Sequence, residues 1–242
     1  MIRGFAVILL SVVLMGFIPI NRSSPQARSL VGQWSFNERC GRIAVDNVLN
    51  NNGSLGGSTL TFKDNYADFP GTSLNYINCP NFKWYAGSEI TIMFWNKTAG
   101  GTTGSAINIG NQSSTGTNIV NCHAPYSDNN LYWDYGTNNN NGGAGRISTS
   151  YSAYLNKWTH VALVNNGVNW KAIYFNGILA TSSTTAATPP VAMTGLTIGA
   201  WVLANNYHYG KMMDFRIYNR ALSSNEIKEV YLNSKNLFIN KR

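Results

Sequence analysis

The stretch DFRIYNRALSSNEIKEVY, residues 214–231, decides the fold. Its first part closes a run of alternating and apolar residues, 210–219, which predicts a strand. Its second part predicts a helix over 223–235, because Ser223 or Ser224 can cap the first turn and Ile227, Val230 and Tyr231 form one apolar face. The chain therefore ends with a strand that leads directly into an amphipathic helix.

Short runs of the same kind recur upstream, separated by loops rich in Gly, Asn, Ser and Thr. Asn176-Gly177 lies between two such runs and predicts a hairpin with a tight primed turn. Many strands with a single terminal helix predict one all-β domain, a sandwich of two antiparallel sheets. The predicted strands are 30–36, 58–62, 74–79, 89–97, 105–110, 129–136, 158–166, 170–180, 195–200 and 210–219.

The charge pattern argues against a nucleic-acid partner. The 242-residue chain carries a net charge of +8. Most of that excess lies near the ends: between residues 30 and 227 there are 11 Lys and Arg against 9 Asp and Glu, 11 minus 9, a net of +2. Nucleic-acid binding surfaces usually show basic residues clustered with aromatic ones, and the linear sequence shows no such stripe.

The N-terminal segment indicates export. Arg3 precedes an apolar run over residues 5–20, which has the length of a signal-peptide core and is slightly short for a bilayer span. Residues 1–28 are therefore expected to be a signal peptide, or an anchor that attaches the chain to a membrane through 5–20, followed by a short linker. Either alternative places the domain, 29–235, and its basic tail, 236–242, outside the cell or on its surface.

The three cysteines, Cys40, Cys79 and Cys122, allow at most one disulfide. His123 follows Cys122, but no second Cys-His pair and no Cys-x-x-Cys exists. The sequence therefore predicts no zinc site.

Several segments, in order, resemble the laminin-G-like domain of the concanavalin A-like lectin/glucanase superfamily. The resemblance spans residues 30–232, and its most specific segment is the stretch quoted first. The family implies a two-sheet antiparallel jelly-roll sandwich, widely used outside cells to bind glycans or proteins. The matching segments are LVGQWSFNE, DNVLNNNGSL, ADFPGTSLNYINCP, ITIMFWNK, KWTHVALV, IYFNGIL, LTIGA and DFRIYNRALSSNEIKEVY.

The resemblance also implies a structural calcium ion in many members. Its pattern would place one acidic ligand at Asp46, in the loop after the first strand, and another at Asp214. Met213 replaces one of the two acids usual in the final strand. The alternative for Asp46 is an Asx turn that caps its own loop without a metal.

Catalysis is not expected, although some relatives of this fold are glycoside hydrolases. Glycosidases usually need two carboxylates that flank the scissile bond. None of the four glutamates has an acidic partner two or four residues away, as a strand-borne catalytic pair would require. The sequence therefore predicts a non-catalytic recognition module that binds a glycan or a surface protein; a structural or assembly subunit of a surface layer, appendage or virion is the alternative.

Two aromatic loops offer the chemistry of carbohydrate binding, namely rings that stack on sugar C–H groups beside amides and carboxylates for the hydroxyls. They are APYSDNNLYWDYG (124–136) and WVLANNYHYG (201–210). Alternation places Trp133 on one strand face and Tyr132 and Asp134 on the other. A similar run in some laminin-G-like sequences ends where Arg146-Ile147 stands here, and this resemblance implies a pair of Asp134 with Arg146. A purely structural role for 124–136 remains open. The candidate ligand contacts are Tyr126, Tyr132, Trp133, Trp201, Tyr207 and Tyr209.

Overall fold

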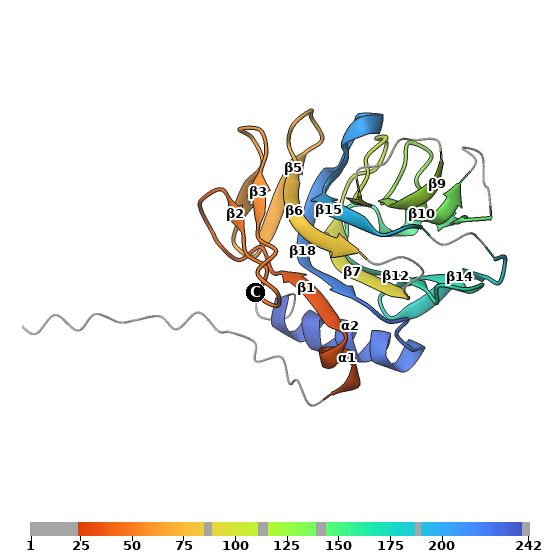
Figure 1. Cartoon of the computed structure of the whole chain (residues 1–242). Coiled ribbons are helices and arrows are strands. Elements are labelled where there is room, and N and C mark those ends of the chain that lie inside the picture. Colours follow the sequence, from red (N-terminus) through yellow and green to blue (C-terminus); the bar gives the residue numbers. More distant parts are fainter. Residues whose placement is uncertain (1–23, 85–88, 111–115, 139–143, 187–189, 239–242) are drawn as a thin grey trace, which may run out of the picture.

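A computed structural model describes residues 24–84, 89–110, 116–138, 144–186 and 190–238. Two antiparallel eight-stranded sheets, called sheet A and sheet B below, form a sandwich. The helix α2 (Ser224–Phe238) packs on the face of sheet A that is turned away from sheet B. Figure 1 shows these three layers. The structure confirms the predicted fold class, a two-sheet antiparallel sandwich with a short helix at the C-terminus.

Sheet A contains the strand that leads into α2. Its order is β14 (Ile178–Ser183), β13 (Lys171–Phe175), β12 (Thr159–Asn165), β7 (Ile90–Lys97), β18 (Tyr209–Tyr218), β5 (Tyr66–Pro70) and β4 (Thr61–Lys63), with β1 (Leu30–Trp34) beside β18. Sheet B has the order β11 (Arg146–Ser150), β10 (Asn130–Asn138), β9 (Gly116–His123), β8 (Ile107–Ile109), β15 (Met193–Ile198), β6 (Ile77–Trp84), β3 (Gly53–Leu55) and β2 (Ile43–Ala44).

Short elements complete the fold. A two-stranded hairpin of β16 (Ala200–Trp201) and β17 (Asn206–Tyr207) surrounds the 3-10 turn η2 (Val202–Ala204). A second 3-10 turn, η1 (Ser152–Tyr154), follows β11, and the one-turn helix α1 (Pro25–Arg28) precedes β1. Among the described residues, no helix combines the length and the hydropathy that a membrane crossing requires. The predicted membrane segment, residues 5–20, lies outside the described residues.

The main core fills the space between the two sheets. Trp34 of β1 contacts Phe215 of β18 with ring centroids 5.9 Å apart, and Phe94 of β7 stacks on Phe215 at 5.8 Å. These side chains face sheet B because alternate residues of a strand point to opposite sides. Trp34 and Phe36 are fully buried, and burial of such aromatic area is the main source of stability.

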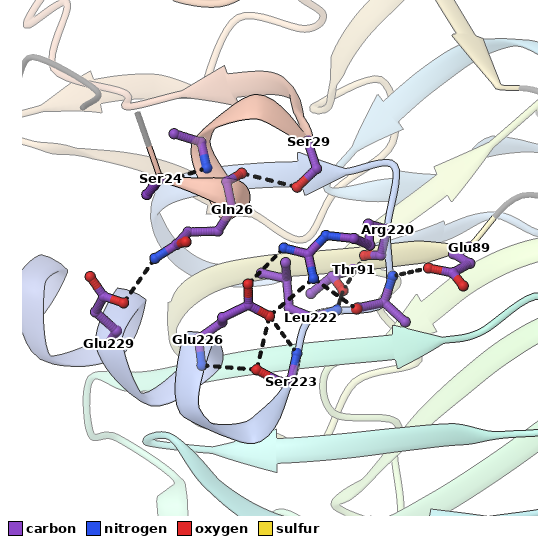
Figure 2. A network of polar contacts seen from close by, with 12 residues as sticks. Ser24, Gln26, Ser29, Glu89, Thr91, Arg220, Leu222, Ser223, Glu226 and Glu229 are labelled. Atoms are coloured by element: carbon purple, nitrogen blue, oxygen red, sulfur yellow. Dashed lines mark hydrogen bonds and ion pairs between the residues drawn. The ribbon is translucent and has the colours of Figure 1, made fainter. Parts of the chain in front are cut away.

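Side-chain hydrogen bonds fix the start of α2 (Figure 2). The backbone N–H of Glu226 donates to Ser223 Oγ at 3.4 Å, and the Glu226 carboxylate accepts from the Ser223 N–H at 2.8 Å, which is a capping box. Arg220 donates to both oxygens of Glu226, and this contact lowers the pKa of Glu226 to about 2. Gln26 of α1 donates to Glu229 at 2.8 Å and so ties α1 to α2.

The hairpin prediction is confirmed in detail. Asn176 and Gly177 join β13 to β14 with φ angles of +51° and +75°, in the left-handed region that a primed turn requires. The first-strand and helix predictions also correspond to observed elements, whereas the strand expected over 74–79 lies later, at Ile77–Trp84. Several observed strands have no counterpart among the predicted ones, including β5, β11 and β9, and the asparagines of β9 disfavour strand by propensity.

All three cysteines are unpaired in the structure. Cys79 of β6 and Cys122 of β9 face the core from strands that are separated by β8 and β15. Burial raises the pKa of both thiols well above the usual range, so both stay protonated at neutral pH. Stability therefore comes from packing and not from a cross-link.

Candidate functional site

The candidate site lies on the outer face of sheet B, the face turned away from sheet A. On β9, Val120 and Cys122 point into the core, which places Asn121 and His123 on the outer face. On β10 the same alternation places Tyr132 on the outer face, beside the register partner His123. Strand geometry alone therefore brings together polar and aromatic groups from both strands.

Four rings form an aromatic cluster on this face: His123, Tyr126, Tyr132 and Trp201. His123 is the common neighbour, with its ring centroid 4.8 Å from Tyr126, 6.3 Å from Tyr132 and 6.1 Å from Trp201. Tyr126 and Tyr132 meet edge to face at 6.0 Å. The two aromatic loops that the sequence presents separately thus converge on one histidine.

Charged groups hold the tyrosines in place. Tyr132 donates its hydroxyl to Asp128 at 2.5 Å, and the Arg146 guanidinium lies 4.9 Å from the centre of the Tyr132 ring. Burial opposes the ionisation of Asp128, but hydrogen bonds from Tyr132 and Asn130 outweigh it and lower the pKa of Asp128. The phenol is therefore fixed between a carboxylate and a guanidinium.

Arg146 is itself anchored by a buried carboxylate. Its Nε and one terminal nitrogen donate to the two oxygens of Asp134 at 2.6 and 2.8 Å, which confirms the predicted pair. Asp134 is fully buried, while the Arg146 side chain keeps some exposure. This bidentate geometry orients the guanidinium towards Tyr132.

His123 is a buried, neutral ring. Burial lowers its pKa below the usual range, although the nearby Asp134 opposes that shift. Its Nδ1 lies 3.2 Å from the carbonyl of Gly104 and 3.1 Å from Ser105 Oγ. A carbonyl can only accept, so the contact with Gly104 requires the proton on Nδ1. The histidine therefore serves as a rigid support for the three other rings.

A buried polar row runs across the same face, made of Asp134, Asn121, Asn108 and Thr197, which are successive register partners on four neighbouring strands. Thr197 Oγ1 donates to the Ala200 carbonyl at 2.7 Å, and this bond folds the turn before Trp201 back onto the sheet. The row therefore continues inward from the aromatic cluster.

Two members of that row are unusual, because both side-chain polar atoms of Asn108 and of Asn121 are buried and find no hydrogen-bond partner within the described part of the chain. Buried polar atoms in native proteins nearly always have one, and each exception costs about 1–3 kcal/mol. The sheet thus keeps four unsatisfied polar atoms in the middle of one face, next to the aromatic cluster.

The predicted ligand contacts divide into three groups. Tyr126 and Tyr132 are half-exposed members of the cluster. Trp133 is 0% exposed and donates Nε1 to the Val164 carbonyl at 3.2 Å, so its assignment as a ligand contact is wrong: it faces the core. Trp201 is only 4% exposed, so it packs against His123 inside the cluster and presents little surface to a ligand.

The remaining two candidates do not belong to the cluster. Tyr207 is half-buried and its nearest described ring is Tyr76, with centroids 6.5 Å apart. Tyr209 is 46% exposed, but it begins β18 in sheet A, where its carbonyl accepts from Thr98 Oγ1 at 2.6 Å. The structure therefore separates Tyr209 from the surface that its neighbours in the sequence help to form.

Asp46 does not resemble a calcium ligand. Its carboxylate is buried and accepts backbone N–H bonds from Gln33, Val48, Leu49 and Asn51 at 2.9–3.2 Å. The partial positive charges of these N–H groups already stabilise the Asp46 carboxylate. Because the groups occupy most of its oxygen lone pairs, few remain for a cation. The geometry corresponds to the alternative prediction, a carboxylate that caps its own loop.

Asp214 is likewise engaged. Arg216 forms an ion pair with it at 2.8 Å, and Gln33 Nε2 donates to it at 2.9 Å. Arg216 thus occupies the position of the counter-ion. Within the described residues, no group of three or more His, Cys, Asp or Glu side chains could hold a metal. The residues predicted for calcium therefore do not fit the ion.

The carboxylates that a glycosidase would need are also engaged elsewhere. All ten Asp and Glu residues lie in the described part of the chain, and none forms a hydrogen bond with another carboxylate there. Asp134, Asp214 and Glu226 pair with arginines, and Asp68 pairs with Lys63. Such pairs are structural contacts rather than an acid and a base facing an open cleft.

Sequence reasoning missed two parts of this site. His123 was considered only as a metal ligand, and its position among three other aromatic groups depends on the pairing of β9 with β10. Asn108 and Asn121 looked like ordinary loop or strand asparagines. The available signal for an outward polar face was Asn108 between Ile107 and Ile109, together with Asn121 between Val120 and Cys122.

The comparisons with known proteins agree with this architecture. Residues 71–228 match the family described as the concanavalin A-like lectin/glucanases superfamily. The chain belongs to this superfamily. A comparison with curated proteins returned no match.

Solved structures with a similar fold include binding domains of botulinum neurotoxins. The serotype D binding domain has a TM-score of 0.63 at 18% identity, with 87% of this chain and 53% of that chain covered. The serotype G binding domain has a TM-score of 0.62 at 16% identity, with 85% and 51% covered. The serotype D ligand-binding domain in complex with N-acetylneuraminic acid has a TM-score of 0.60 at 19% identity, again with 85% and 51% covered.

These similarities concern the fold. The chain spans about half the length of the neurotoxin chains that it matches. The similar structures are named as binding domains. What this chain binds has to be argued from its own side chains.

Proposed function

We propose that the protein is a non-catalytic recognition module that binds carbohydrate through the aromatic cluster on the outer face of sheet B. The observation that carries the proposal is the convergence of two separate loops on His123, which presents Tyr126 and Tyr132 at the surface beside Asp128 and Arg146. Partly exposed, rigid rings with neighbouring charged groups are the usual means of sugar recognition on a sandwich.

The chemistry of the cluster suits a pyranose. A tyrosine ring can stack on the C–H face of a sugar, while Asp128 and Asn130 accept from or donate to its hydroxyls. Asp128 is exposed and Asn130 is half-exposed, so both are accessible to a ligand. The complex of a similar fold with N-acetylneuraminic acid supports a glycan ligand in general.

We also propose that the protein acts outside the cell or at its surface. The apolar run 5–20 supports export, either as a cleaved signal or as a membrane anchor. N-terminal sequencing of the mature protein distinguishes the two. A start near residue 28 corresponds to cleavage, whereas an intact N-terminus in a membrane fraction corresponds to an anchor; an intact N-terminus in the soluble cytoplasmic fraction would contradict export.

A glycan array probed with the full chain tests the binding function. For the best glycan on the array, we expect the double variant Tyr126→Ala/Tyr132→Ala to lose affinity by about thirtyfold or more, since central aromatic contacts contribute about 2 kcal/mol or more. Isothermal titration calorimetry gives the affinity, and circular dichroism verifies the fold of each variant.

Tyr209→Ala is the matched control, because it removes an exposed tyrosine that lies on the other sheet. This variant should bind like the unchanged protein. Absence of binding on a broad array would contradict the proposal, and formation of a stable large assembly by the same sample would favour the structural-subunit alternative. Loss of binding only in Tyr209→Ala would place the site on sheet A.

A further inference from the structure

A cavity of about 400 Å³ lies on the side of the sandwich, between β1 of sheet A and the end of β6 of sheet B. Small-molecule sites typically have volumes of about 300–1,000 Å³. Within the described part of the chain, β1 pairs as a strand only with β18, and residues 81–84 of β6 pair only with β15. The cavity therefore opens where each sheet has a free edge.

The inner wall of the cavity is apolar. Phe82 and Trp84 line it from β6; both are buried and belong to the main core. Val31 lines it from β1 and packs against the same core. The Phe82 ring lies 6.3 Å from the ring of Trp34, which supports it from sheet A. A ligand that enters between the sheets thus meets apolar surface that is already formed.

Leu49 lines the cavity from the loop between β2 and β3, and its side chain is 60% exposed. This loop is fixed by hydrogen bonds. The Asp46 carboxylate accepts from the backbone N–H groups of Leu49 and Asn51, and the Asn51 carbonyl accepts from Trp34 Nε1 at 3.3 Å. A ligand that covers Leu49 would remove apolar surface from water, which favours binding.

The polar groups at the cavity favour an anion. Among the described residues that line it, Lys83 is the one charged side chain, and the amides of Asn51, Asn81 and Asn219 are the other polar side chains besides the Trp84 indole. Lys83 is exposed, and no salt bridge in the described part of the chain reaches it. A cationic ligand would find no carboxylate in this lining.

Trp84 also contributes a hydrogen-bond donor that has no acceptor. Its Nε1 is buried and finds no partner within the described ranges. The other buried tryptophans with printed bonds differ, since Trp34, Trp95 and Trp133 each donate Nε1 to an oxygen. An indole nitrogen can only donate, and buried donors in native proteins nearly always have an acceptor. A ligand with an acceptor group would satisfy this N–H.

We propose that the cavity binds a small amphiphilic carboxylate, with its apolar chain between β1 and β6 and its head group at Trp84 and Lys83. The cavity follows β6 over Asn81–Trp84, roughly 10 Å of strand, which suits a linear chain. Pro80 and the irregular register beside it disfavour an added peptide strand at this edge. The inference is independent of the aromatic cluster.

NMR spectroscopy of the isotope-labelled full chain tests this proposal, with octanoate as the probe. The indole N–H signal of Trp84 should shift and saturate as octanoate is added, because the carboxylate accepts from it. Octylammonium carries the same chain with the opposite charge, and acetate carries the head group without the chain. Neither should move the signal.

Three variants refine the test, and amide shifts of Val31 and Leu49 give their affinities. Trp84→Phe keeps an aromatic wall but removes the donor, and should weaken octanoate binding about tenfold. Lys83→Gln should weaken it about threefold. Leu49→Ser changes an exposed side chain that the core does not need, and should also weaken binding about threefold.

The matched controls are Trp158→Phe and Lys228→Gln, which make the same changes on the outer face of sheet A and on α2. Both should bind octanoate like the unchanged protein. The Tyr126→Ala/Tyr132→Ala variant should do so as well, so failure of the carbohydrate site on sheet B is distinguishable from failure here.

Three results would overturn the proposal. The first is an unchanged Trp84 indole signal at every octanoate concentration below micelle formation. The second is an equal shift with octylammonium, which would show unspecific apolar contact. The third is a nuclear Overhauser contact, in the protein without octanoate, between the Trp84 ring and the apolar run 5–20, which would assign the cavity to the chain's own N-terminal segment.

Discussion

The outer faces of the two sheets differ in how many of their buried polar side-chain atoms have hydrogen-bond partners. On sheet A, α2 covers an apolar layer that includes Met93, Val164 and Ile227, and among the described residues under the helix one buried polar atom, Nδ1 of His160, has no hydrogen-bond partner. On sheet B, the buried row keeps Asn108 and Asn121 without partners. One face is thus optimised for stability, whereas the other retains polar groups at a cost in stability, as binding surfaces often do.

The largest difference in the free energy of unfolding is expected between variants that break an ion pair on sheet B and on sheet A. Arg146→Met leaves Asp134 buried and unpaired, and should lower the free energy of unfolding by about 3 kcal/mol. Lys63→Met breaks the exposed pair with Asp68 on sheet A and should leave the free energy of unfolding almost unchanged, because solvent screens the pair. Urea denaturation at pH 7 measures both. Equal losses in the free energy of unfolding would show that the Asp134–Arg146 pair stabilises the protein no more than the exposed pair does.

Acid should expose a difference between the histidines of the two faces. Burial lowers the pKa of His160, under α2, to about 3, whereas an unfolded histidine titrates near 6.5. The unfolded state therefore takes up the proton first, and stability is lost as pH falls below 6.5. Between pH 6.5 and 4.5, His160 should account for about 2 kcal/mol.

The variant His160→Phe should flatten this pH dependence, as followed by urea denaturation at several pH values. His123→Phe on sheet B should flatten it less, because Asp134 opposes the effect of burial on His123 and Gly104 accepts from its ring. His208, whose pKa burial also lowers to about 3, contributes the remaining slope. A His160→Phe protein with an unchanged slope would refute the assignment of this slope to His160.

The buried polar row should respond to substitution in the opposite direction from sheet A. Asn108→Leu replaces an unsatisfied amide by an apolar group of similar size and should raise the free energy of unfolding by about 1 kcal/mol. Thr91→Val on sheet A should lower it by about 1 kcal/mol, since Thr91 donates to Arg220 and accepts from Leu222. Urea denaturation measures the free energy of unfolding of both variants. If Asn108→Leu destabilises the protein, the Asn108 amide has hydrogen-bond partners in solution.

The smallest effect is expected from calcium. Since Asp46 and Asp214 are saturated by N–H donors and Arg216, adding Ca²⁺ or a chelator should leave the melting temperature unchanged. Differential scanning calorimetry in both conditions measures it. A clear rise with Ca²⁺ would show that a site forms in spite of these contacts.

The sequence was sufficient for the architecture because its signals are local. The capping box at Ser223, the Asn176-Gly177 turn and the alternating strands each depend on a few neighbouring residues. Alternation also predicted that Tyr132 and Trp133 face opposite ways, and the family resemblance of this stretch implied the pair of Asp134 with Arg146.

The candidate site was less predictable because it depends on contacts between distant strands. Alternation could not tell whether Tyr132 or Trp133 faces solvent; the stacking of the two sheets decides that. The unsatisfied amides of Asn108 and Asn121 result from the register of β8 with β9. That register cannot be read from residue types alone.

The central claim is that the outer face of sheet B binds carbohydrate, and mapping by NMR tests it most directly. Titration of the isotope-labelled protein with the best glycan from the array should shift the amide signals of Tyr126, Asn130 and Tyr132, and leave those of Lys97 and Lys211 in place. Shifts confined to sheet A, or no shifts on β10 at saturation, would contradict it.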